Sequence, residues 1–227
     1  MKIFKKNVLK YNKKLIELGL QFYNFGNLSL RIGNFCIIKP SGVDLYKIEY
    51  NDISIVNIKT GRHLSGQKPS VDTPTHLELY RKYPTIKSIA HTHSKYATVW
   101  AQSLMPVPCY GTTHADFFLG NIPITKTLSL KQVSRNYEKQ IGLSIIQAVK
   151  KRNILELPGV LLANHGVYSW GKDLNSTLNN SLVIEFVSEI AFNTRLINKN
   201  IKPINTTLNK KHFYRKNGPN SYYGQKY

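Results

Sequence analysis

The chain has 227 residues, which suits one domain or two, and 41% of them are hydrophobic. Its formal net charge is +20, and no stretch approaches the roughly 18 to 20 apolar residues that a membrane-spanning helix needs. Two well-separated cysteines and a lysine-rich start without an apolar run predict a reduced, cytoplasmic protein that carries no signal peptide and does not span a membrane.

The strong positive charge raises the question of nucleic-acid binding. The basic residues are spread along the whole chain, and lysine dominates over arginine, although arginine is the better reader of bases and phosphates. Asparagine and isoleucine are also abundant, which is typical of a gene that has drifted towards A and T codons. We therefore interpret the charge as a solvated surface and do not expect a nucleic-acid partner.

The first 60 residues predict one helix followed by short strands. Apolar residues at helical spacing cover residues 3–19, where Gly19 ends the pattern. Residues 27–39 alternate around Gly33-Asn34, which predicts a hairpin with a tight turn. Residues 53–58 alternate apolar with polar side chains, as a half-buried strand does.

The middle of the chain predicts a helix, a strand and a second helix. The first helix covers residues 74–83, with proline in its first turn and Asp72 or Thr73 near its cap. A strand at 88–92 and a helix at 95–102 follow.

Two long helical patterns, at 128–151 and 175–199, flank a hairpin formed by residues 159–163 and 167–170. The tail, about 208–227, is polar, aromatic and basic, and a tail of this kind often packs on a neighbouring subunit. Mixed strands, hairpins and helices predict an α/β fold. We expect a single domain over 1–227, a three-layer αβα sandwich around a largely antiparallel sheet.

Three histidines form a candidate metal site. His91 and His93 are two apart in a predicted strand, so their side chains point to the same face. His165 lies in a turn between two predicted strands, where Gly166 suits a tight bend. Three histidines with an open position are typical of catalytic zinc, and Asp72 could add an oxygen ligand. A histidine pair in a strand is by itself more often structural than a metal ligand.

Three turns carry small or polar residues suited to an anion: residues 26–29 (GNLS), 39–42 (KPSG) and 68–70 (KPS). Small residues let backbone N–H groups approach an anion, and Lys39 adds a point charge. Each turn alone is an ordinary loop. Together with the histidines they predict a phosphorylated substrate.

The stretch from Gly111 to Asp116 has neither helical nor strand periodicity and is interpreted as a polar loop. Catalytic groups are often carried on loops that a rigid sheet supports. Asp116 could move a proton there, and a turn-stabilising aspartate is the plainer alternative.

Taken together, the motifs resemble the L-ribulose-5-phosphate 4-epimerases of the class II aldolase superfamily. The resemblance runs in order from Gly26 to Gln225. The motifs are GNLS, IKPSGVD, KPSVDTPTHLELY, HTHSKYATVWAQ, GTTHADFF, NHGVYSWGK and YYGQ. The resemblance implies a class II aldolase-like fold and a homotetramer whose active sites lie between subunits.

Residue roles follow from this resemblance, position by position. It implies one Zn²⁺ per subunit, held by Asp72, His91, His93 and His165. It implies Asp116 and Tyr223 as the acid–base pair, with Tyr223 reaching in from the adjacent subunit. The implied substrate-binding residues are Gly26, Asn27, Lys39, Ser41, Gly42, Ser70, Val71, Thr112, Glu138, His212 and Arg215.

The implied reaction interconverts L-ribulose 5-phosphate and D-xylulose 5-phosphate. A base removes the proton of the C4 hydroxyl, the C3–C4 bond breaks, and the aldehyde rotates before the bond re-forms. Zinc would stabilise the developing charge, and manganese or cobalt could substitute for it. Either an arabinose or an ascorbate pathway could supply this substrate.

The chain departs from the epimerase pattern at four positions. Val71 stands where a second serine is usual, and Asn136 where a glutamate is common. Phe25 replaces a usual tryptophan, and Asn217 a usual histidine. Only Val71 bears on a predicted contact, because it removes a phosphate-binding hydroxyl.

Two alternatives stay open. One is an aldolase resembling L-fuculose-phosphate aldolase, although those enzymes typically place a glutamate where Asp72 stands. The other is a non-catalytic basic binding protein, which the +20 charge supports.

Overall fold

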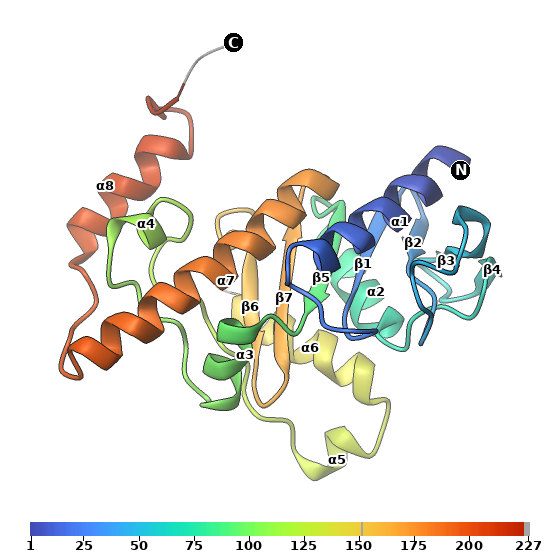
Figure 1. Cartoon of the computed structure of the whole chain (residues 1–227), viewed down its shortest axis with the longest axis horizontal. Helices are drawn as coiled ribbons and strands as arrows, with labels where there is room; N and C mark the ends of the chain where they lie inside the picture. The colour runs from blue at the N-terminus through green and yellow to red at the C-terminus, as the bar shows by residue number, and fades with distance from the viewer. Residues whose placement is uncertain (151, 225–227) are drawn as a thin grey trace.

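The computed structural model describes residues 1–150 and 152–224 and contains a seven-stranded antiparallel sheet with helices on both faces (Figure 1). Lys151, at the end of a predicted helix, and Gln225, the last residue of the YYGQ motif, lie outside the described residues. The strands are β1 (Asn27–Ile32), β2 (Phe35–Ile38), β3 (Ser54–Asn57), β4 (His63–Ser65), β5 (Ser88–Thr92), β6 (Gly159–Leu162) and β7 (Gly166–Gly171). Their order is β4-β3-β2-β1-β5-β7-β6, which confirms the predicted α/β fold.

The helices cover the two faces of this sheet. They are α1 (Lys2–Glu17), α2 (Thr73–Lys82), α3 (Lys95–Gln102), α4 (Thr112–Ala115), α5 (Leu130–Val133), α6 (Tyr137–Val149), α7 (Leu174–Ile197) and α8 (Thr206–Lys216). One 3₁₀ turn, η1, spans Tyr50–Asp52. Helices α1, α3 and α7 lie on one face and α2 and α6 on the other (Figure 1). Among the described residues, no helix combines the length and apolar character that crossing a bilayer requires.

Alternation along β1 shows how the two layers form. Leu28 and Leu30 are buried on the side of α1, within the cluster that contains Val8. Ser29 points to the other face, where its hydroxyl contacts His76 Nδ1 (2.8 Å) and Tyr80 Oη (2.7 Å) of α2. Burying a leucine side chain is worth about 1.5–3 kcal/mol, so each face is held mainly by its apolar layer.

Helices α2 and α6 pack unusually closely. A Cβ atom added at Gly142 would lie 2.8 Å from Glu78 Cβ, so no larger residue fits without displacing α2. Thr75 Oγ1 also donates to the backbone oxygen of Glu138 at 2.5 Å. This helix pair fixes the start of α2 and the start of α6 against each other, and both starts face the candidate site.

Four segments differ from the sequence prediction. The helical pattern at 128–151 is interrupted, because Asn136 adopts the left-handed conformation (φ 51°) between α5 and α6. The expected polar loop at 111–116 contains the single helical turn α4. No strand was predicted at β4 and no helix at α8, where the Asn205 side chain caps the first turn by accepting from Leu208 N at 2.8 Å.

Candidate active site

Three histidine rings converge beside the end of the internal strand β5. The ring centroids of His91, His93 and His165 are 4.7 to 4.9 Å apart. One nitrogen from each ring lies within 4.8 Å of the others. His91 is buried, and His93 and His165 are half-buried.

Strand pairing places these rings. His91 lies opposite Asn27 of β1 and opposite Tyr168 of β7, whose ring stacks on the imidazole at 4.4 Å and 12°. His165 lies in the turn between β6 and β7, and the left-handed residue of that turn is Asn164 (φ 61°). Gly166, predicted to provide this bend, is needed for another reason: a Cβ there would lie 2.6 Å from the backbone oxygen of Thr92.

Hydrogen bonds orient two of the rings. His91 Nδ1 lies 3.1 Å from the backbone oxygen of Val167, which only accepts, so Nδ1 carries the proton and Nε2 carries the lone pair. His165 Nδ1 lies 3.2 Å from the hydroxyl of Tyr137. Nε2 of His91 and Nε2 of His93 face each other at 3.1 Å.

Burial keeps the rings neutral. Desolvation, reinforced by His165 and His93, lowers the pKa of His91 well below its usual 6.5. Desolvation likewise lowers the pKa of His93 and of His165. Neutral imidazoles whose ring nitrogens lie within 4.8 Å of one another are a donor set that a divalent cation can use, so these residues fit a metal ion.

Asp72 adds a carboxylate to the same cavity. It occupies the cap position of α2 but makes no side-chain capping hydrogen bond. Instead Asn27 Nδ2 donates to Asp72 Oδ2 at 2.6 Å and to Ser70 Oγ at 3.1 Å. Asn27 Oδ1 is buried and has no hydrogen-bond partner among the described residues, so it can accept from a bound hydroxyl.

Lys39 was predicted to act as a point charge for an anion, but in the structure it mainly binds backbone oxygens. It is buried, and its Nζ donates to the backbone oxygens of Asn24 (2.9 Å) and Gly26 (3.1 Å). Burial lowers its pKa, while Asp72 opposes the shift. Lys39 therefore holds the loop before β1 in place and has one remaining N–H for a ligand.

The cavity around these groups has a volume of ≈ 320 Å³. Most of the predicted substrate-binding residues line it, together with Asp72 and the three histidines. These are Gly26, Asn27, Lys39, Ser41, Gly42, Ser70, Val71 and Glu138. Tyr137, Asn24 and Phe25 also line it, and the sequence did not assign a contact to any of them.

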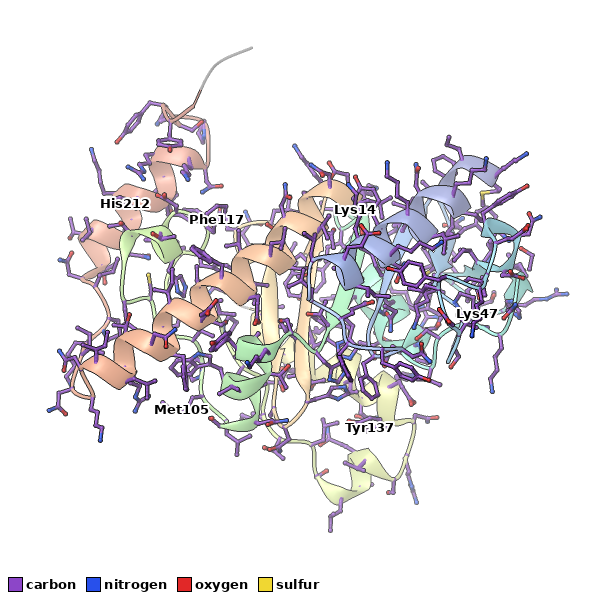
Figure 2. All side chains as sticks on the ribbon, in the orientation of Figure 1. Lys14, Lys47, Met105, Phe117, Tyr137 and His212 are labelled. Atoms are coloured by element: carbon purple, nitrogen blue, oxygen red, sulfur yellow. The ribbon has the colours of Figure 1, made fainter. Side chains whose placement is uncertain are left out.

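The remaining predicted residues gather elsewhere. Asp116, Thr112, His212, Arg215 and Tyr223 are not among the residues that line the cavity. In Figure 2, His212 lies at the α8 end of the molecule, well apart from Tyr137 at the cavity wall. The structure of one chain thus brings three of the four predicted metal ligands together, the histidines, while Asp72 lines the same cavity outside that group. Both predicted acid–base residues lie outside the cavity.

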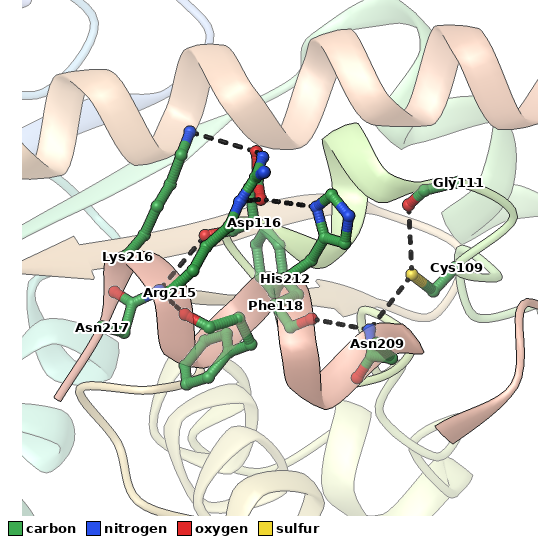
Figure 3. A network of polar contacts seen from close by, with 10 residues as sticks. Cys109, Gly111, Asp116, Phe118, Asn209, His212, Arg215, Lys216 and Asn217 are labelled. Carbon is green, nitrogen blue, oxygen red and sulfur yellow. Dashed lines mark hydrogen bonds and ion pairs between the residues drawn. The ribbon is translucent and has the colours of Figure 1, made fainter. Parts of the chain in front are cut away.

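Asp116 forms the centre of an ion-pair cluster with α8 (Figure 3). Arg215 donates to both carboxylate oxygens, at 3.0 and 2.9 Å, His212 Nδ1 lies 3.1 Å from Oδ1, and Lys216 Nζ 3.1 Å from Oδ2. Tyr223 lies under the cations of Arg215 (4.9 Å) and Lys216 (4.5 Å). Desolvation acts to raise the pKa of Asp116, but the donors from Arg215, Lys216 and His212 outweigh it and lower this pKa.

The α/β sandwich and its three-histidine cavity define a protein equipped to hold a metal ion beside a small polar ligand. The family description "Class II Aldolase and Adducin N-terminal domain" matches residues 6–192, and the chain belongs to this family.

Solved structures support this placement. One is an L-fuculose 1-phosphate aldolase, 25% identical over 92% of this chain and 94% of that one, with a TM-score of 0.78. Two others share the fold: YgbL from Klebsiella pneumoniae, a putative aldolase/epimerase/decarboxylase (24%, covering 92% and 97%, TM-score 0.74), and L-fuculose-1-phosphate aldolase from Thermus thermophilus (20%, covering 87% and 97%, TM-score 0.70).

Proposed function

We propose that this chain is a zinc-dependent epimerase that interconverts L-ribulose 5-phosphate and D-xylulose 5-phosphate. The observation that carries the proposal is the convergence of three neutral imidazoles beside the Asp72 carboxylate, in a cavity also lined by anion-binding groups. A divalent cation held there would act as a Lewis acid towards the carbonyl and hydroxyl oxygens of a ketose phosphate.

The cavity wall suits the phosphate end of such a substrate. Ser41 and Ser70 offer hydroxyl groups, Gly42 leaves open space where a Cβ would lie, and Lys39 offers its remaining N–H. Glu138 and the free Oδ1 of Asn27 can accept from sugar hydroxyls. Orienting the sugar between these groups keeps its reacting carbons near the histidines.

The proton-transfer residues are proposed to come from another subunit. Asp116, just after α4, and Tyr223, in the tail after α8, belong to one cluster that is not part of the cavity of their own chain. In a homotetramer, α8 and the tail of one subunit would cover the cavity of a neighbour. Asp116 and Tyr223 would then exchange protons with the two faces of the rotating aldehyde.

An aldolase acting on a related sugar phosphate is the second candidate. The 25% identical structural relative is named as an L-fuculose 1-phosphate aldolase, which favours it. The aspartate at position 72 and the aspartate at position 116 favour the epimerase. Both reactions share bond cleavage and differ in whether the aldehyde fragment is released.

A product assay decides between them. Purified protein, stripped with chelator and reloaded with Zn²⁺, is incubated with L-ribulose 5-phosphate, and the D-xylulose 5-phosphate formed is followed by a coupled enzyme. Zinc-dependent epimer formation supports the proposal. Release of free aldehyde without epimer supports the aldolase, for which L-fuculose 1-phosphate is the matched substrate. Turnover of neither sugar phosphate by protein that holds stoichiometric zinc would overturn both.

A further inference from the structure

The Tyr137 hydroxyl lies within hydrogen-bond distance of one of the three histidines, His165. Tyr137 is the first residue of α6 and lines the cavity, and its hydroxyl lies 3.2 Å from Nδ1 of His165. His165 lies in the β6–β7 turn, and the strand pairing of β6 with β7 ends before it reaches this residue. No other hydrogen bond to the His165 ring is present among the described residues.

The direction of this hydrogen bond sets what the ring can bind. When Nδ1–H donates to the phenol oxygen, the Nε2 lone pair is free and the phenol hydrogen is available to another acceptor. When the phenol donates to Nδ1, Nε2 carries the proton and cannot be a ligand. His91 has no such choice, because its Nδ1 faces the backbone oxygen of Val167.

The position of Tyr137 is built in by its neighbours. The left-handed Asn136 (φ 51°, ψ 50°) turns the chain immediately before α6. Thr75 Oγ1 holds the backbone oxygen of Glu138, the next residue. Because Asp72 is the cap residue of α2, the same helix pair places both the carboxylate and the phenol at the cavity.

We propose that Tyr137 is a positioning residue that accepts the Nδ1–H of His165 and so holds this ring in the tautomer and orientation that present Nε2 to the metal ion. This inference rests on the metal site of the proposed function. It assigns Tyr137 no contact with the reacting atoms. Groups that orient a metal ligand in this way are worth about 10–100-fold in metal affinity or activity when removed.

The test removes only the phenol oxygen. Tyr137→Phe is compared with the wild type and with Tyr83→Phe, a matched control whose hydroxyl is buried, has no hydrogen-bond partner among the described residues and does not line the cavity. Zinc affinity is measured by competition with a chromophoric chelator, without substrate. The ring tautomer of His165 is measured by ¹⁵N NMR of metal-free, histidine-labelled protein at pH 8, with His165→Asn providing the assignment.

We expect Tyr137→Phe to bind zinc about 10–100-fold more weakly and to shift the His165 ring from its Nδ1–H form towards Nε2–H. Tyr83→Phe should match the wild type in both measurements. An unchanged tautomer, or unchanged zinc affinity, in Tyr137→Phe would overturn the inference, and so would a loss of affinity as large in the control. Both measurements are independent of turnover: wild-type protein that binds zinc but converts no sugar phosphate refutes the proposed function and still leaves the role of Tyr137 decided.

Discussion

The histidine cavity and the Asp116–α8 cluster are built in opposite ways. The cavity takes its groups from β1, β5, the β6–β7 turn and the starts of α2 and α6, all anchored in the sheet and its flanking layers. The cluster joins the four-residue α4 to α8 at the periphery, and Tyr223 beside it is 59% exposed. The contrast agrees with the proposal that one chain supplies the metal site and a second copy supplies the proton-transfer residues.

The largest effect is expected at the cavity itself. His93→Asn removes one of three ligand nitrogens from a half-buried position, so the protein should lose stoichiometric zinc and at least about 10³-fold in kcat/KM. Its melting temperature in the metal-free state should stay near that of the wild type. His63→Asn, on the exposed edge strand β4, is the matched control. Retention of zinc by His93→Asn would show that the three rings are not the ligand set.

Tyr223→Phe should impair the proposed proton transfer and leave the metal site intact. It keeps zinc but should lose about 10²-fold or more in kcat, the usual contribution of a general acid or base. Fully active Tyr223→Phe would remove this residue from the mechanism.

Mixing the two inactive variants tests whether an active site combines the histidine cavity of one subunit with the tail of another. His93→Asn and Tyr223→Phe, denatured and refolded together, should regain part of the wild-type activity, because some sites then combine an intact cavity with an intact tail. Each variant refolded alone is the control. If the mixture stays as inactive as its components, the cavity and the tail of a site belong to the same chain.

Local pattern explains what could be predicted from the sequence. Strand β5 and helix α3 were predicted at their observed bounds, because alternation and helical spacing are visible within a few residues. His91 and His93 were paired for the same reason. Helix α8 was missed because only Asn209 and Phe213 are buried along it, too few apolar positions to show a helical period.

Contacts between residues far apart in the sequence could not be predicted from the local pattern. Tyr137 was predicted to lie inside a continuous helix, and only the left-handed Asn136 and the packing of α6 on α2 place its hydroxyl at His165, 28 residues away. Asp116 was expected beside the metal, whereas its carboxylate is bound by Arg215, 99 residues away. Ion pairs between distant segments leave no periodic trace in a sequence.

The Asp116–α8 cluster should also loosen in acid. Its donors lower the folded-state pKa of Asp116 below 3.8, so its stabilisation is fully present above that unfolded value and is lost as the pH falls through the folded pKa. Proteolytic cleavage of the α8 tail should be constant from about pH 8 to 5 and rise below about pH 4. Asp116→Asn should be cleaved more readily at neutral pH and show little of this dependence. Wild-type cleavage independent of pH would mean that other contacts hold α8.

The smallest effect is expected at the rim of the cavity. Val71 lines it beside Ser70 but is 57% exposed, so it offers an apolar surface where a hydroxyl could bind a phosphate oxygen. Val71→Ser should lower KM for the sugar phosphate by about 3–10-fold, the worth of one typical net hydrogen bond, with kcat unchanged. Val71→Ala, which removes the side chain without adding a donor, is the control. Equal KM values for the serine and alanine variants would place the phosphate elsewhere on the wall, nearer Ser41 and Gly42.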